Sequence, residues 1–121
     1  MSQSFTVLKN NVNLITLDTK SIDVKKITHV NESSNVELKF EFNRAKGENY
    51  ALGVPLNITL INPLNQGDKI TINIEFATIN SAAIQWLDKE QTLSKEHPFL
   101  FTQCEAILCR TLFPCQVNTT I

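Results

Sequence analysis

The sequence lacks the residue patterns that most catalytic sites require. Its two histidines, His29 and His97, lie far apart, so the H-E-x-x-H helix that presents two imidazoles to zinc is absent. The three glycines, Gly47, Gly53 and Gly67, are scattered and form no phosphate-binding loop. No G-x-S-x-G elbow for a nucleophilic serine occurs either. These absences predict that the chain alone is inactive and holds no metal or other cofactor.

The chain also lacks charge of one sign and long apolar runs. Its formal net charge is -1 over 121 residues, which gives no basic field to attract nucleic acid or anionic lipid. The first residues, Met1 to Lys9, form no secretory signal, and no window approaches the roughly 20 apolar residues of a membrane span. We therefore expect a cytoplasmic protein with no nucleic-acid partner and no membrane partner.

Cysteine is scarce, and all three cysteines lie near the C-terminus. An odd count argues against a closed disulfide framework, and the spacing of Cys104, Cys109 and Cys115 does not match the C-x2-C pairs of structural zinc sites. His97 could complete a Cys3His set with them, but nothing in the spacing favours this over an ordinary loop histidine. The pattern predicts free thiols in a reducing compartment, packed as small buried side chains.

Alternating apolar and polar residues, by contrast, are frequent. The clearest strand runs from Val36 to Phe42, and two more alternating runs cover Leu56–Leu60 and Ile70–Phe76. Weaker β-prone runs are Phe5–Lys9, Leu14–Asp18 and Asp23–Val30, and Asn10-Asn11 between the first two favours a turn that pairs them. Polar loops are expected over 43–49 and 62–68.

These short strands with turns between them predict one all-β domain, an antiparallel sandwich or barrel. The only helix expected is a short one, or a turn, near Glu105–Thr111, and Trp86 between apolar neighbours is expected in the core.

Residues 103–115 break the strand alternation and place a carboxylate among apolar neighbours. Glu105 lies between Cys104 and Ala106, so it points either to solvent or into a cleft where it could hold an ammonium group. The pattern alone leaves both readings open.

The last third of the chain carries a resemblance to a known family. It resembles the N-terminal β domain of the H-E-x-x-H zinc aminopeptidases, which include the leukotriene A-4 hydrolases. The resembling residues are IQWL at 84–87, EQT at 90–92, KEHPFLF at 95–101, QCEA at 103–106, CR at 109–110 and FPCQ at 113–116, with LDTK at 17–20 earlier in the chain.

The resemblance implies a saddle-shaped β domain that forms one wall of a substrate cleft. Zinc and the general base of the family come from a separate catalytic domain, which this chain lacks. At the family's Q-x-E motif, Glu105 would bind the free α-amine of a peptide N-terminus and Ala106 would line the first specificity pocket. Gln103 would bond to substrate backbone or brace the loop.

Three departures from the family pattern matter. Glu105 stands where the hydrolases carry glutamine, so this position is similar to ordinary aminopeptidases. The other two are Leu108 and Val117, which replace a usual histidine and a usual aspartate. Apart from these residues, opening strands usual in the family are also missing before Phe5. We therefore expect residues 1–121 to form a single partial domain whose partner is the missing catalytic domain. The alternative is a stand-alone β-sandwich that binds a protein or peptide without catalysis.

Overall fold

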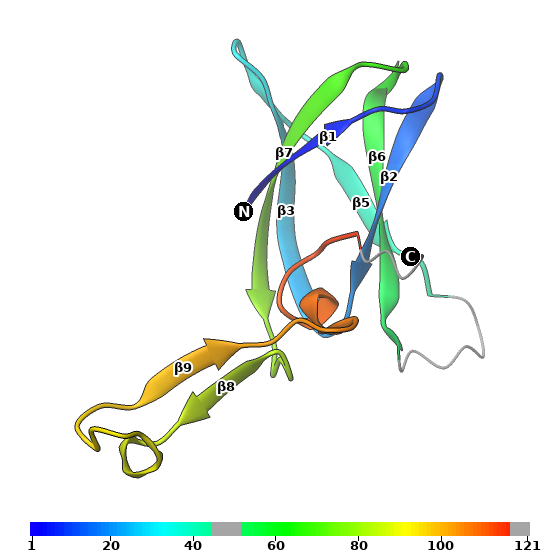
Figure 1. Ribbon diagram of the computed structural model, residues 1–121. Coiled ribbons are helices and arrows are strands. Elements are labelled where there is room, and N and C mark those ends of the chain that lie inside the picture. Colours follow the sequence, from blue (N-terminus) through cyan, green and yellow to red (C-terminus); the bar gives the residue numbers. More distant parts are fainter. Residues whose placement is uncertain (45–51, 117–121) are drawn as a thin grey trace.

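The computed structural model describes residues 1–44 and 52–116, and these residues form two antiparallel sheets and a separate hairpin (Figure 1). The first sheet has the order β1-β7-β3-β4, with bounds Ser2–Thr6, Lys69–Thr78, Ile22–Val30 and Asn35–Glu37. The second has the order β2-β6-β5, with bounds Val12–Thr19, Val54–Leu64 and Lys39–Phe42. The hairpin joins β8 (Ile84–Leu87) to β9 (Phe99–Thr102). The predicted all-β antiparallel sandwich is confirmed.

The core lies between the two sheets and consists almost entirely of aliphatic side chains. Ile27, Ile72 and Ile74 of the first sheet and Leu56 and Ile58 of the second are fully enclosed. Each such side chain contributes about 1.5–3 kcal/mol through removal of apolar surface from water. The alternation that predicted strands at Leu56–Leu60 and Ile70–Phe76 therefore marks the residues that hold the sheets together.

The strand predicted over Val36–Phe42 is instead two strands in different sheets. β4 pairs with β3, whereas β5 pairs with β6, and the chain crosses between the sheets at Leu38. Leu38 is only 3% exposed, and its backbone N–H donates to the carbonyl of Ile27 at 2.8 Å. The alternation is present, but it does not reveal that the chain changes sheets. A run that crosses from one sheet to the other keeps the same side chains facing the core on both sides of the bend.

The predicted pairing of the first two strands is wrong. The turn at Asn10-Asn11 exists, and Asn11 has a positive φ of 58°, which asparagine tolerates. However, β1 pairs with β7 and β2 pairs with β6, so the turn carries the chain from one sheet to the other. The strand over Asp23–Val30 is confirmed as β3. β6 runs to Leu64, so the loop expected over 62–68 is shorter, and most of the loop expected over 43–49 lies outside the described residues.

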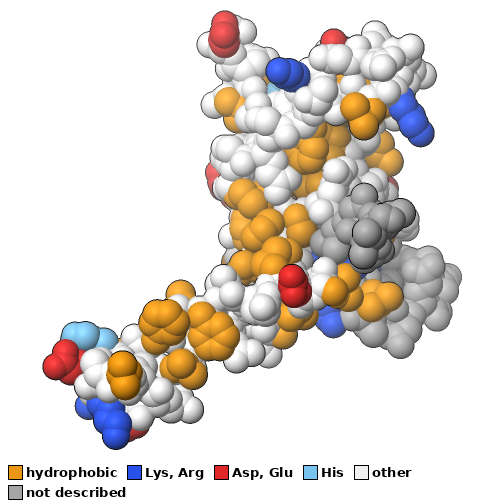
Figure 2. All heavy atoms as spheres, viewed as in Figure 1, with side chains coloured by type: hydrophobic (Ala, Val, Ile, Leu, Met, Phe, Trp, Pro, Cys, Tyr) orange, Lys and Arg blue, Asp and Glu red, His pale blue; other side chains and the backbone are white. Residues whose placement is uncertain are grey.

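The expected core position of Trp86 is also wrong, because the β8–β9 hairpin projects away from the sandwich (Figure 1). Trp86 is 65% exposed, and Phe99 and Leu100 on the facing strand are 58% and 46% exposed. Figure 2 shows apolar side chains gathered along this projection. A single 3-10 turn, η2 (Lys89–Gln91), lies near the tip of the hairpin.

The short helix expected near Glu105–Thr111 is confirmed in its second half, as the 3-10 helix η3 (Leu108–Thr111). It lies at the base of the sandwich, where the hairpin joins it (Figure 1). No helix formed by the described residues has the length and apolar content needed to span a bilayer.

Candidate functional site

The candidate site begins where the hairpin returns to the sandwich. The backbone N–H of Gln103 donates to the carbonyl of Ala83 at 2.9 Å, which closes the base of the hairpin, and Ala83 is only 1% exposed. The side chain of Gln103 then accepts a hydrogen bond through its Oε1 atom from the backbone N–H of Glu105 at 3.1 Å. Gln103 therefore braces the loop that presents Glu105.

Glu105 and Ala106 are exposed, and both line an open hollow of about 460 Å³. The hollow is lined by Cys104, Glu105, Ala106, Cys109, Phe113, Cys115 and Gln116. Among the described side chains, none forms an ion pair with Glu105. The structure thus brings Glu105 and Ala106 to one hollow, with Gln103 directly behind them.

A disulfide joins Cys104 to Cys109 across the Glu105 loop, with the two Cα atoms 4.6 Å apart. The prediction of free thiols is therefore wrong for these two residues and holds for Cys115 alone. The prediction of fully buried cysteines is wrong as well, because all three are only partly buried. Spacing could not reveal the pairing, since five residues of separation fit either a closed loop or two separate positions.

The segment after the disulfide is fastened to the end of β2. Asp18 and Cys115 form an isolated antiparallel bridge, with N–H to carbonyl distances of 2.7 Å and 3.2 Å. The carbonyl of Arg110 accepts from the backbone N–H of Lys20 at 2.7 Å. Thr78 adds a side-chain bond to the carbonyl of Leu112 at 2.6 Å. These contacts fix residues 110–115 against both sheets.

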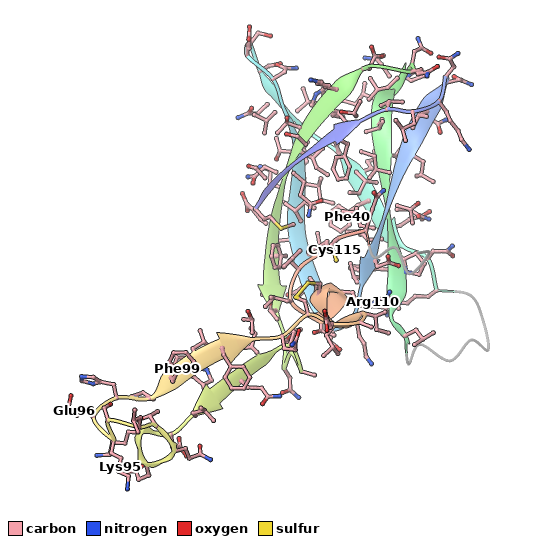
Figure 3. All side chains as sticks on the ribbon, in the orientation of Figure 1. Phe40, Lys95, Glu96, Phe99, Arg110 and Cys115 are labelled. Carbon is pink, nitrogen blue, oxygen red and sulfur yellow. A yellow bond between two sulfur atoms is a disulfide. The ribbon has the colours of Figure 1, made fainter. Side chains whose placement is uncertain are left out.

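Arg110 is a further anchor that the sequence did not reveal. Its Nη1 atom donates to the carbonyl of Leu52 at 2.7 Å, its Nε atom donates to the carbonyl of Ile107 at 3.1 Å, and its guanidinium lies 4.0 Å from the carboxylate of Asp18. Figure 3 shows Arg110 on η3, with Cys115 on the segment that follows. The carbonyl of Leu52 belongs to a distant segment, so no residue pattern could indicate this bond.

Electrostatics at the site affect one group in particular. Burial raises the pKa of the Cys115 thiol, the carboxylate of Asp18 raises it further, and Arg110 opposes both effects. The thiol is therefore protonated at neutral pH and is a poor nucleophile.

The described residues do not fit a metal ion. No set of three or more His, Cys, Asp or Glu side chains in residues 1–44 and 52–116 could hold one. His97, the possible fourth ligand beside the cysteines, is exposed in the loop between η2 and β9. The Cys3His alternative therefore has no support in the described part of the chain.

Fold and site together define an all-β domain that presents a braced, exposed carboxylate beside an open hollow. The sequence matches the family described as "Peptidase M1 N-terminal domain" over residues 2–116. The chain belongs to this family, which confirms the resemblance seen in its last third.

Individual relatives agree with the family match. The chain is 38% identical over 124 residues to leukotriene A-4 hydrolase of Xenopus laevis, covering 99% of this chain and 19% of that relative. It is 36% identical to leucine aminopeptidase 2 of Lodderomyces elongisporus, covering 88% of this chain and 15% of the relative. A solved structure of yeast LTA4 hydrolase in complex with bestatin has a TM-score of 0.69 at 33% identity, covering 94% of this chain and 17% of that one. The chain thus spans less than a fifth of the length of these relatives.

Proposed function

We propose that this chain forms one wall of the substrate cleft of a zinc aminopeptidase and that Glu105 binds the free α-ammonium group of a peptide. The observation that carries the proposal is the position of Glu105, which is exposed at the rim of the 460 Å³ hollow with its own N–H fixed by Gln103. A fixed carboxylate selects a protonated amine, whereas an acetylated N-terminus leaves it without a counter-charge. The relatives named leucine aminopeptidase 2 support the choice of a peptide N-terminus as ligand.

Gln103 and Ala106 complete the substrate-binding residues that we propose. The Oε1 atom of Gln103 already accepts a bond from the loop, so its Nε2 donors remain to bind a carbonyl of the substrate backbone. Ala106 is small and exposed in the same hollow, so it leaves space for the first side chain of a peptide.

Catalysis requires groups that the described residues do not supply. A separate catalytic domain is the partner that we propose, because the relatives are more than five times as long as the 121 residues described by this sequence. That domain would bring zinc and the general base, and the 121-residue chain alone would not hydrolyse peptides. The cytoplasmic location expected from the sequence belongs to the same proposal.

The alternative function is a stand-alone interaction module. The observation in its favour is the exposed apolar surface of the β8–β9 hairpin, where Trp86 is 65% exposed and Leu93 is completely exposed. Such surfaces on a small domain mark contacts with other proteins. A module of this kind would bind its partner through the hairpin and would not distinguish a free amine from an acetylated one.

The test is a titration of the isotope-labelled chain with leucinamide and with N-acetyl-leucinamide, followed by NMR. We expect leucinamide to shift the amide signals of residues 103–106 with a dissociation constant of about 1–10 mM, since half of the site is present. Glu105→Gln should weaken this binding by about tenfold, the value of one charge-assisted bond. Glu96→Gln is the matched control, because Glu96 is an exposed carboxylate at the hairpin tip (Figure 3).

Equal binding of the two ligands, or full binding by the Glu105→Gln variant, would refute the amine-binding role. Turnover of leucinamide by the 121-residue chain would refute the statement that it is inactive alone.

A further inference from the structure

We propose that the Cys104–Cys109 disulfide is a redox switch for the loop that presents Glu105. The loop is ordered when the disulfide is formed and loosened when the disulfide is reduced. The consequence for amine binding rests on the function proposed above. The effect on the loop itself does not.

The disulfide encloses the two residues that matter most at the site. Glu105 and Ala106 lie between the bonded cysteines, and the Cα separation of 4.6 Å is within the range that disulfides adopt. Hydrogen bonds also hold this stretch: the backbone N–H of Leu108 donates to the carbonyl of Cys104 at 2.9 Å, and the backbone N–H of Glu105 donates to the Oε1 atom of Gln103. The Nε atom of Arg110 donates to the carbonyl of Ile107. Glu105 and Ala106 between these contacts are exposed, so a covalent closure restricts the conformations that they can adopt.

The bond is open to reduction. Cys104 and Cys109 are only partly buried, and both line the same open hollow as Glu105. A dithiol reductant can therefore reach their sulfur atoms. In the reducing compartment that the sequence predicts, disulfides are mostly transient and redox-sensing rather than structural.

Reduction would loosen the loop without unfolding the domain, because the following residues have anchors of their own. Arg110 donates to the carbonyl of Leu52, and Cys115 is bridged to Asp18 of β2. The contacts that fasten this part of the chain do not involve the disulfide. The switch is therefore confined to residues 103–109.

The third cysteine does not compete for the pairing. Cys115 lines the same hollow and is free, but an attacking sulfur must be a thiolate. Burial keeps the pKa of this thiol raised, so at neutral pH it stays protonated. Exchange then occurs only with an external thiol.

The chemistry balances as an ordinary thiol–disulfide exchange. A thiolate of the dithiol attacks one protein sulfur and forms a mixed disulfide, and the other cysteine leaves as a thiolate and takes up a proton. The second thiol of the reductant then closes its own ring and releases the remaining cysteine. Two electrons and two protons pass from the dithiol to Cys104 and Cys109.

The experiment compares the oxidised chain with the chain reduced by dithiothreitol, with the disulfide state verified by mass. Backbone order parameters of residues 105–108 should fall from about 0.85 to below about 0.6 on reduction, while that of Ile58 in the core stays unchanged. Leucinamide should bind the reduced chain about three- to tenfold more weakly, because ordering the loop then opposes binding.

Two variants sharpen the comparison. Cys115→Ser should respond to reductant as the natural chain does, because Cys115 takes no part in the pairing. The double variant Cys104→Ser, Cys109→Ser should resemble the reduced chain and ignore the reductant.

Equal order parameters in the two states would overturn the proposal, as would failure of the disulfide to form under an oxidising thiol couple or loss of the response in Cys115→Ser. If leucinamide binds both states equally, the redox effect on binding fails while the amine-binding function stands. If it binds neither state, the amine-binding function fails, and the order parameters still decide whether the loop is redox-controlled.

Discussion

Replacement of Arg110 by alanine should destabilise the domain more than replacement of an exposed charged residue, because the side chain of Arg110 joins three segments. It links the loop before β6, the Glu105 loop and the end of β2 through two hydrogen bonds and one ion pair. Its side chain is only 13% exposed. Water therefore replaces these contacts incompletely when the guanidinium is removed.

The expected cost can be assembled from its parts. The partly buried bond from Nε to Ile107 involves a charged donor and contributes about 1.5–3 kcal/mol. The bond to Leu52 is exposed and contributes about 0.5–1 kcal/mol, and the ion pair with Asp18 at 4.0 Å contributes about 0–1 kcal/mol. We therefore expect Arg110→Ala to lower the free energy of unfolding by about 2–5 kcal/mol.

The assay is urea unfolding followed by far-ultraviolet circular dichroism, in which this change moves the midpoint by about 1–2 M. Arg110→Lys keeps the charge but loses the two-pronged geometry, so it should lose about half as much stability. Arg44→Ala is the matched control: Arg44 is exposed and lies over the ring of Phe42 at 5.5 Å, a contact that contributes about 0.5–1 kcal/mol. If Arg110→Ala costs no more than Arg44→Ala, the anchoring role is refuted.

Three further predictions follow from burial. Ile58→Ala should lower the free energy of unfolding by about 2–5 kcal/mol in the same urea assay, because the Ile58 side chain on β6 is fully buried. Ile61→Ala in the same strand should change it by less than about 0.5 kcal/mol, because Ile61 is 60% exposed. Equal losses of stability would contradict the assigned core. Alkylation of Cys115 by iodoacetamide at mildly alkaline pH should be at least about tenfold slower in the folded chain than in urea, because burial raises its pKa. The folded state holds the proton of the Cys115 thiol more tightly than the unfolded state does. The stability that this thiol contributes is therefore fully present below its pKa in the unfolded chain and is lost as pH rises through its pKa in the folded chain. Urea titrations at several alkaline pH values will measure this loss.

Much of the fold was predictable because strand formation is a local property. Alternation marked β6 and β7, and β-branched residues marked β3; apolar side chains of these strands are among those that the core encloses. The stretch around Gln103 and Glu105 was predictable as the candidate site for a similar reason, since it breaks the alternation and carries the family motif.

Strand partners were not predictable in the same way. The pattern from Val36 to Phe42 is the same whether the run stays in one sheet or crosses at Leu38, because the inward face is unchanged. The turn at Asn10-Asn11 likewise indicates a reversal but not which strand receives the chain. These choices depend on contacts between residues far apart in the sequence.

The sequence by itself therefore determined an all-β domain of the peptidase M1 N-terminal family and the segment where a site would lie. The tertiary structure decided that Trp86 is exposed, that Cys104 pairs with Cys109, and that Arg110 anchors the loop between them and β2. The physical reason is that the exposure of Trp86 and the bond from Arg110 to Leu52 depend on where distant segments meet, which only the packing of the sheets and the hairpin fixes. The Cys104–Cys109 pairing depends on the backbone path of the loop between them, which residue spacing does not fix.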